Sequence, residues 1–159
     1  MDWGSNATVQ AGIGTGWRTL TLSEWSYVFN TRSTTSGIRY AKAQVNNVNG
    51  VILLPDNWSS SYHSLSNTNQ SGASFSSNVI SSSTWTNSLE AHGAVFLPAA
   101  GLRDETSVNL VGSYGYYWSA SYYDSSGAYR VDFSGGELDT NSASNRYRGE
   151  SVRLVHDAE

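Results

Sequence analysis

The chain has 159 residues and a formal net charge of −4, and its 9 Lys and Arg residues form no basic stripe. We therefore expect one domain over residues 1–159, with a core of its own and no nucleic-acid partner. Cysteine is absent, which excludes disulfides, thiolate metal sites and cysteine nucleophiles. No apolar run approaches the ~18 residues of a membrane-spanning helix, so we expect no membrane insertion by this chain. The N-terminus has no signal-peptide pattern, so we expect any targeting signal to lie outside this chain.

Neutral polar groups must supply the solubility, because charged residues make up only 14% of the chain and aromatic residues reach 13%. The 10 tyrosines stand among many Ser, Thr, Asn and Gly residues. This composition resembles that of a recognition surface, where tyrosine gives contact area at a low cost in conformational entropy. It is also typical of an ordinary β-rich domain of a secreted protein, and composition alone favours that plainer interpretation.

Residues 1–17 are rich in glycine and polar residues, and we predict a flexible entry loop. Gly12, Gly14 and Gly16 alternate in this segment. No apolar strand precedes them, however, and the GxxxxGK[ST] pattern of a phosphate-binding loop is missing. We therefore do not predict a nucleotide site here.

A helix follows, and its start is encoded by a capping box at Thr21 and Glu24, T-x-x-E. In this motif each of the two side chains accepts a hydrogen bond from a backbone N–H at the helix start. Apolar residues then recur at helical spacing: Leu22, Trp25, Val28 and Phe29. We predict that the helix ends near Arg32 and buries this stripe in the core.

Two strands and a tight turn come next. Residues 38–45 and 51–54 have the apolar character of strands. Asn49 and Gly50 lie between them, and Asn-Gly is a strong signal for a two-residue hairpin turn. We therefore predict the turn at these two residues.

A polar segment rich in Ser and Asn, residues 59–83, predicts a long surface loop. A short helix over residues 84–92 should end at Gly93, because glycine readily adopts the left-handed conformation that closes a helix. Residues 94–97 have the pattern of a buried strand that Pro98 stops.

The last third of the chain, residues 114–155, has the pattern of an antiparallel meander. We predict strands at residues 116–121, 128–133, 137–140 and 151–156, and a polar loop at 141–150.

The strand at 128–133 alternates between two kinds of side chain. Alternation places Tyr129, Val131 and Phe133 on a core face and Arg130 and Asp132 on an outward face.

Small polar and aromatic residues lie between the apolar positions of this meander, and we predict that they form a ligand-binding surface. The tyrosines would give flat contact area, and the polar side chains would give directional hydrogen bonds. The set is Tyr122, Tyr123, Asp124, Ser125, Ser126, Arg130, Asp132, Asp139, Asn141, Ser142, Ser144, Asn145 and Tyr147.

Residues that could carry catalysis form no recognisable motif. His63, His92 and His156 lack metal-ligand spacing, and the chain contains no G-x-S-x-G motif and no ordered Asp/Asn run of a calcium loop. A carboxylate pair for glycoside hydrolysis stays open, since a sequence gives no distance between side chains. We predict that the protein is not an enzyme, and we predict no metal and no cofactor.

Six segments in colinear order are specific as a set: GWRTLTLSEW (16–25), GVILLPDNW (50–58), LEAHGAVFLPAAGLR (89–103), GSYGYYWSAS (112–121), AYRVDF (128–133) and SVRLV (151–155). Together they resemble the fibrobacter-type major paralogous domains of gut bacteria and their phages. Those domains resemble in turn the variable proteins of diversity-generating retroelements, which use a C-type lectin fold.

The resemblance implies an α+β, C-type-lectin-like fold, in which two short helices pack on small twisted antiparallel sheets with long irregular loops. It also implies that residues 114–155 include a hypervariable surface, because adenine-directed mutagenesis in such retroelements rewrites codons near the 3′ end of the gene. The residue types that such codons reach fill residues 122–127 and 139–149. Relatives of this kind carry an upstream first strand that pairs with the C-terminal one, so we expect a fragment or a shortened form.

These inferences predict a receptor-binding or adhesion domain whose partner is a protein or glycan on a cell or phage-host surface. We expect it on a cell surface or in a phage particle, such as a tail fibre. Two alternatives stay open: a structural or spacer domain of a surface protein or tail fibre, and a carbohydrate-active enzyme.

Overall fold

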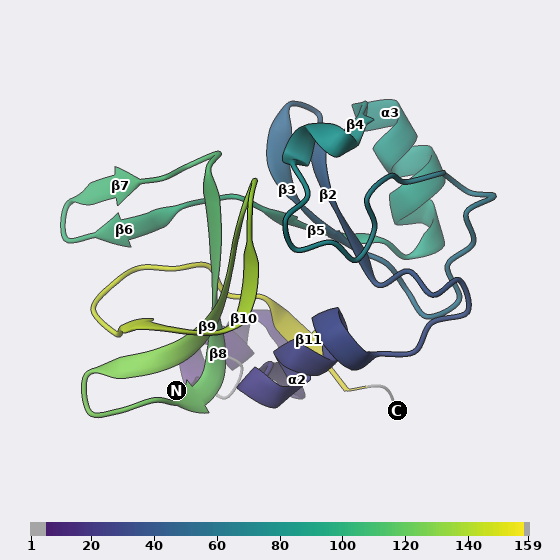
Figure 1. Cartoon of the computed structure of the whole chain (residues 1–159). Coiled ribbons are helices and arrows are strands. Elements are labelled where there is room, and N and C mark those ends of the chain that lie inside the picture. The colour runs from purple at the N-terminus through teal and green to yellow at the C-terminus, as the bar shows by residue number, and fades with distance from the viewer. Residues whose placement is uncertain (1–5, 158–159) are drawn as a thin grey trace.

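Two β-sheets organise the structure, a computed structural model that describes residues 6–157 (Figure 1). A four-stranded sheet has the strand order β4-β2-β3-β5, and a three-stranded sheet has the order β10-β9-β8. Neighbouring strands are antiparallel except in the β2–β4 pair. The strands are β2 (Tyr40–Val45), β3 (Val48–Leu53), β4 (Val79–Ile80), β5 (Val95–Pro98), β8 (Tyr114–Tyr122), β9 (Gly127–Ser134) and β10 (Leu138–Asn145).

Two small antiparallel ribbons and several short helices complete the chain. The ribbons pair β1 (Trp17–Thr19) with β11 (Leu154–His156), and β6 (Leu102–Asp104) with β7 (Ser107–Asn109). The helices are α1 (Ala7–Ile13), α2 (Leu22–Ser26) with its π-helical continuation η1 (Tyr27–Thr31), η2 (Phe75–Ser77), and α3 (Ser82–Thr84) with its continuations η3 (Trp85–Leu89) and η4 (Glu90–His92). Short helices beside small sheets make this an α+β chain.

The helix predicted from the capping box is confirmed. The Thr21 side chain accepts a hydrogen bond from the N–H of Glu24, and the Glu24 carboxylate accepts one from the N–H of Thr21. Trp25 and Phe29 on its apolar stripe are fully buried, and Arg32 caps the C-terminal end. The second predicted helix is also present, over α3, η3 and η4, and it closes at Gly93 with a φ of 88°.

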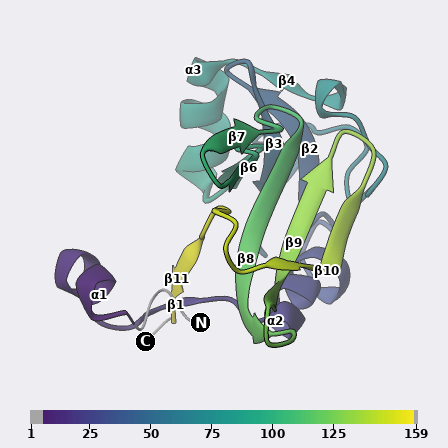
Figure 2. The ribbon, with the colours of Figure 1, turned by 90° about the vertical axis from the view of Figure 1, so that its left-hand side faces the viewer.

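The prediction of an irregular entry segment is wrong for residues 6–17; residues 1–5 lie outside the described part of the chain. The Asn6 side chain accepts hydrogen bonds from Thr8 N and Val9 N and so caps α1, which ends at Gly14. None of the residues of α1 is buried, and Figure 2 shows this helix standing away from both sheets.

The partner of the C-terminal strand lies inside the chain. The structure pairs β1 with β11 in antiparallel register, with Trp17 opposite His156 and Thr19 opposite Leu154. The expected upstream strand is therefore not needed for this pairing. β1 was not predicted because a strand of only three residues gives no periodic signal in the sequence.

The hairpin turn between β2 and β3 lies at Asn46 and Asn47, so its prediction at Asn49-Gly50 is wrong. Both turn residues have positive φ, 48° and 64°, a conformation that asparagine tolerates. Gly50 lies within β3, where a Cβ would come within 2.4 Å of Leu97 O and 2.5 Å of the Phe96 ring. Close packing, and not a turn, requires glycine at this position.

Two hydrophobic clusters lie on opposite faces of the four-stranded sheet. The first joins both sheets and α2 through Trp25, Phe29, Tyr40, Val51, Phe75, Leu97, Ala99, Tyr117, Val131 and Phe133. The second lies beneath α3 and its continuations and contains Ala43, Val45, Ile52, Leu54, Trp58, Ile80, Leu89 and Ala94. Val131 and Phe133 therefore face the core, as predicted from the alternation in their strand.

Part of the predicted surface loop 59–83 is ordered by this packing. Phe75 and Ile80 are buried, and Ile80 belongs to β4, which runs parallel to β2. The mostly serine and asparagine composition gives no periodic signal for so short a strand.

Lys42 connects the two sheets through main-chain atoms. The side chain is completely buried, and its Nζ donates to the carbonyl oxygens of Ser71, Ser134 (2.7 Å) and Glu137 (2.7 Å). The last two carbonyls belong to the β9–β10 turn. Desolvation lowers the pKa of Lys42 to about 8, while the charge of Glu137 acts in the opposite direction.

Candidate functional site

The first half of the polar loop predicted at residues 141–150 is a strand, since β10 reaches Asn145. A bulge interrupts its pairing with β9 between Asp139 and Ser142. After β10 the chain crosses to the other edge of the sheet, where Ser151 N donates to Tyr116 O (2.9 Å) and Trp118 N donates to Ser151 O (3.0 Å). This crossing segment covers one face of β8 and β9, and it shapes the candidate site.

The turn between β8 and β9 is held by the Asp124 carboxylate. Its Oδ1 accepts hydrogen bonds from Ser126 N (2.8 Å), Ser126 Oγ (3.0 Å) and Gly127 N (2.6 Å). These hydrogen bonds from Ser126 and Gly127 hold the pKa of Asp124 below its ordinary value. Asp124 is therefore an ionised group in a fixed position at the tip of the hairpin.

Three exposed tyrosines gather at this end of the three-stranded sheet. Tyr122 and Tyr147 are each 66% exposed and Tyr123 is 51% exposed. The guanidinium of Arg146 lies 5.1 Å from the centre of the Tyr122 ring and donates to Asp124 O (2.9 Å). The Tyr123 ring packs edge-on against Tyr129, with ring centres 5.1 Å apart. The aromatic surface is thus exposed and at the same time held in place.

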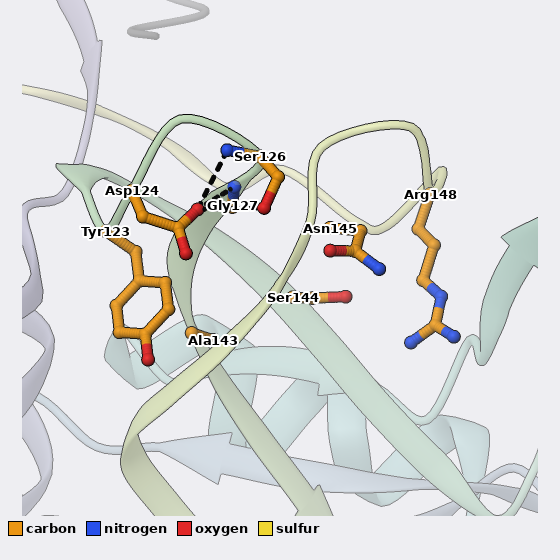
Figure 3. Close-up of a pocket in the computed structure, with 8 residues that line it drawn as sticks. All are labelled: Tyr123, Asp124, Ser126, Gly127, Ala143, Ser144, Asn145 and Arg148. Carbon is orange, nitrogen blue, oxygen red and sulfur yellow. Dashed lines mark hydrogen bonds between the residues drawn. The ribbon is translucent and has the colours of Figure 1, made fainter.

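A hollow of about 250 Å³ opens between this turn and the end of β10 (Figure 3). One wall comes from the turn and consists of Tyr123, Asp124, Ser126 and Gly127. The other wall comes from β10 and the following loop and consists of Ala143, Ser144, Asn145 and Arg148. Five of these eight residues belong to the predicted ligand-binding set.

Arg148 was missed by the sequence analysis, as were Gly127 and Ala143. The Arg148 Nε lies 3.3 Å from the Asp104 carboxylate on β6, so the pairing depends on a segment 44 positions earlier in the chain. An arginine in the sequence RYRGE carries no local signal that its side chain lines a hollow.

The prediction that Arg130 and Asp132 face the solvent is wrong. Both side chains are only 12% exposed, and Arg130 Nη2 lies 3.2 Å from the Asp132 carboxylate. Arg130 Nη1 also pairs with Glu150 Oε1 at 2.5 Å, and the guanidinium stacks 4.3 Å from the centre of the Tyr116 ring. Alternation correctly put these two residues opposite the core, but the crossing segment covers that face.

Glu150, like Arg148, was not predicted from the sequence. Its side chain is completely buried, and desolvation raises its pKa, while the charge of Arg130 acts in the opposite direction. Breaking a buried ion pair by removing one partner leaves an uncompensated charge. Arg130, Asp132 and Glu150 therefore act as a clasp, which ties the crossing segment to the sheet.

The remaining predicted residues are spread over the sheet. Ser125 is exposed at the tip of the turn, and Ser142 Oγ accepts a hydrogen bond from Arg130 Nε (3.4 Å). Asp139 Oδ1 accepts one from Asn141 N (2.7 Å) at the bulge in β10. None of these four residues lines the hollow. The predicted set therefore divides into the hollow, the rim beside it (Tyr122, Ser125 and Tyr147), the clasp and the bulge.

Within residues 6–157 no group of three or more His, Asp or Glu residues could hold a metal ion. In the same part of the chain, no helix combines the length and the apolar character needed to cross a membrane.

Comparison with known proteins gives one family. Residues 71–155 match the model described as "Domain of unknown function (DUF8237)", which covers more than half of the chain. The chain belongs to this family. The matched range contains β8, β9 and β10, the clasp, and every residue that lines the hollow. No curated protein and no solved structure matches this DUF8237 chain.

Proposed function

We propose that the protein is a recognition domain, which binds a protein or glycan on a cell or phage-host surface and makes or breaks no bonds. One observation carries this proposal: exposed Tyr123 lines a polar hollow at one end of the three-stranded sheet, and exposed Tyr122 and Tyr147 lie at the same end. Large aromatic side chains with a polar tip are enriched at binding surfaces, because they bury much area and lose little entropy.

The segments that carry the exposed tyrosines are held in fixed positions, which supports this proposal. Hydrogen bonds to the Asp124 carboxylate fix the β8–β9 turn, and the clasp fixes the segment that carries Tyr147. Binding then costs less conformational entropy, because the contact residues are already ordered before the ligand arrives. A purely structural spacer would gain nothing from exposed aromatic rings held in this way.

We further propose a C-type-lectin-like fold that a diversity-generating retroelement diversifies. In favour of this, β1 near the start of the described chain pairs with β11 near its end, and exposed residues of 122–126 and 145–147 gather at one end of the three-stranded sheet. On this proposal the codons for exposed residues, such as Tyr122, Ser125 and Asn145, vary. Codons for Arg130 and Asp132 stay fixed, because their side chains hold the clasp.

The carbohydrate-active enzyme is disfavoured by the make-up of the hollow. Asp124 is the single carboxylate among its lining residues. Canonical glycoside hydrolysis uses two carboxylates that flank the scissile bond. Asp124 Oδ1 already accepts three hydrogen bonds within the turn, and these lower the pKa of the carboxyl group. A carboxylate of this kind accepts hydrogen bonds but is a poor general acid.

Coding sequences from related strains test the proposal against the spacer alternative. We expect substitutions to concentrate at residues 122–126, 141 and 145–147, next to an unchanged Trp118, Arg130 and Asp132. Substitutions spread evenly over exposed residues of both sheets would contradict a diversified recognition surface.

Binding itself can be measured with the domain immobilised on beads and incubated with candidate host cells. The variant Tyr122→Ala/Tyr147→Ala should lower cell retention at least tenfold, since it removes two exposed rings. Tyr27→Ala is the matched control, because Tyr27 is 54% exposed on η1 and outside the hollow and its rim. Equal losses in both variants would argue against the proposed surface.

A further inference from the structure

The hollow contains polar groups with hydrogen-bonding capacity that the protein does not use. Ser144 is only 9% exposed, and its Oγ has no hydrogen-bond partner although it lines the hollow. This hydroxyl lies near the Glu150 carboxylate and lowers its pKa, but without ordinary hydrogen-bond geometry. The Oγ itself has almost no accessible surface, and the Glu150 carboxylate lies beside it, so this hydroxyl is closed to a guest. The hydrogen-bonding capacity open to a guest belongs to Asp124, Asn145 and Arg148.

The two walls of the hollow offer opposite kinds of hydrogen-bonding group. On the turn wall Asp124 is an ionised acceptor, and its Oδ1 is taken by the turn, which leaves Oδ2 to a guest. On the β10 wall, the amide of Asn145 and the guanidinium of Arg148 are donors. Figure 3 shows Ser144 and Arg148 on the side of the hollow away from Asp124. A guest must therefore donate at one side and accept at the other.

Formal charges at the hollow balance without a ligand. Asp124 and Arg148 carry opposite charges, and Arg148 is already paired with Asp104. The second nearby cation, Arg146, donates to the main chain of Asp124 and lies over Tyr122. A charged guest of either sign would face a like charge on one wall, so an uncharged guest fits better.

The volume of the hollow and its aromatic wall restrict the size and shape of the guest further. A hollow of about 250 Å³ is smaller than the roughly 300–1,000 Å³ of sites that enclose a drug-sized ligand. It suits one small ring with its substituents. Tyr123 offers a half-exposed ring, fixed by its packing on Tyr129, against which the C–H groups of such a guest can lie.

We propose that this hollow binds one neutral sugar ring, a pyranose, whose hydroxyls donate to Asp124 and accept from Asn145 and Arg148. A hydroxyl both donates and accepts, so neighbouring hydroxyls on one ring satisfy both walls at once. This assignment rests on the proposed recognition function and gives its ligand a chemical class.

Ligand-observed NMR with a panel of methyl glycosides tests the assignment: the methyl pyranosides of glucose, galactose and mannose, with methyl glucuronoside and methyl glucosaminide as charged probes. At least one neutral glycoside should bind, and at least tenfold more tightly than either charged probe. Asp124→Asn should weaken it at least tenfold, because asparagine keeps the Oδ1 acceptor of the turn but loses the second carboxylate oxygen.

Glu90→Gln is the control, an exposed carboxylate on η4 outside the hollow and its rim, and it should leave glycoside binding unchanged. Tighter binding of a charged probe, or unchanged binding in Asp124→Asn with the melting temperature preserved, would overturn the assignment.

Cell retention separates this assignment from the recognition function itself. If periodate oxidation of the cell-surface sugars abolishes retention by the wild-type domain, the assignment gains support. If retention survives this treatment and no glycoside binds, the sugar assignment fails and the recognition function stands. If no cell is retained in any condition, the proposed recognition function itself is contradicted.

Discussion

The four-stranded and three-stranded sheets differ in what covers their outer faces. The four-stranded sheet is apolar on both faces, with one hydrophobic cluster on each. On the three-stranded sheet only the face toward α2 carries a hydrophobic cluster, and the other face carries Tyr116 and the clasp of Arg130, Asp132 and Glu150. Hydrophobic packing is non-directional, whereas an ion cluster fixes particular side chains at particular distances. The three-stranded sheet therefore holds the exposed β8–β9 turn and the loop after β10 in fixed positions.

The largest effect should come from Trp118, which is buried on β8 but belongs to neither hydrophobic cluster. Trp118→Ala should lower the free energy of unfolding by about 3–5 kcal/mol, as for a core tryptophan. Urea denaturation measures this loss. A loss below about 1 kcal/mol would show that the clasp side of the sheet does not depend on packing.

Glu150→Ala should cost about 3–5 kcal/mol, because it leaves Arg130 buried with one partner fewer. Replacing the whole cluster, in Arg130→Met/Asp132→Leu/Glu150→Met, should restore most of this loss, since no buried charge is left. Urea denaturation of both variants gives the comparison. We interpret the clasp as a device that positions the crossing segment and adds little to the free energy of unfolding. A triple variant less stable than Glu150→Ala would contradict this interpretation.

Lys42→Met should cost at least about 2 kcal/mol, because three main-chain carbonyls lose their donor at roughly 1–3 kcal/mol for each unsatisfied group. Hydrogen exchange should quicken at the β9–β10 turn, residues 134–137, and stay unchanged at the β8–β9 turn. Faster exchange at both turns would mean that the two ends of the three-stranded sheet are not independent.

Acid titration tests how much Glu24, at the start of α2, contributes to the stability of the protein. Hydrogen bonds from Arg18 lower the pKa of Glu24 from 4.5 to about 2. Between these values the unfolded state binds more protons, so the contribution of Glu24 to stability is full above pH 4.5 and is lost as the pH falls toward 2. Glu24→Gln should flatten this part of the stability profile, measured by urea denaturation between pH 2 and 6. An unchanged profile would exclude Glu24 as its source.

The smallest effects should come from exposed residues of the three-stranded sheet. Ser125→Ala and Asn141→Ala should each change the free energy of unfolding by less than about 0.5 kcal/mol, because both residues are exposed. Thermal melting measures this directly. A large loss in Ser125→Ala would place the tip of the turn in the scaffold and weaken the proposed recognition surface.

Local and periodic features were determined by the sequence alone. The capping box of α2 and the closing Gly93 act through neighbouring backbone groups, so the helices that they bound could be predicted. The alternation in β9 correctly placed Val131 and Phe133 in the core. The exposed Tyr122 and Tyr147 also followed from sequence, since no apolar pattern includes them.

Which residues on the polar face of the three-stranded sheet are exposed depends on tertiary contacts. Arg130 is buried because a segment about 20 residues later crosses over it and brings Glu150 to 2.5 Å. The hollow exists because the β8–β9 turn and the end of β10 meet there, with Arg148 anchored by Asp104. A sequence pattern separates the two faces of a strand, but what covers each face depends on contacts between distant segments.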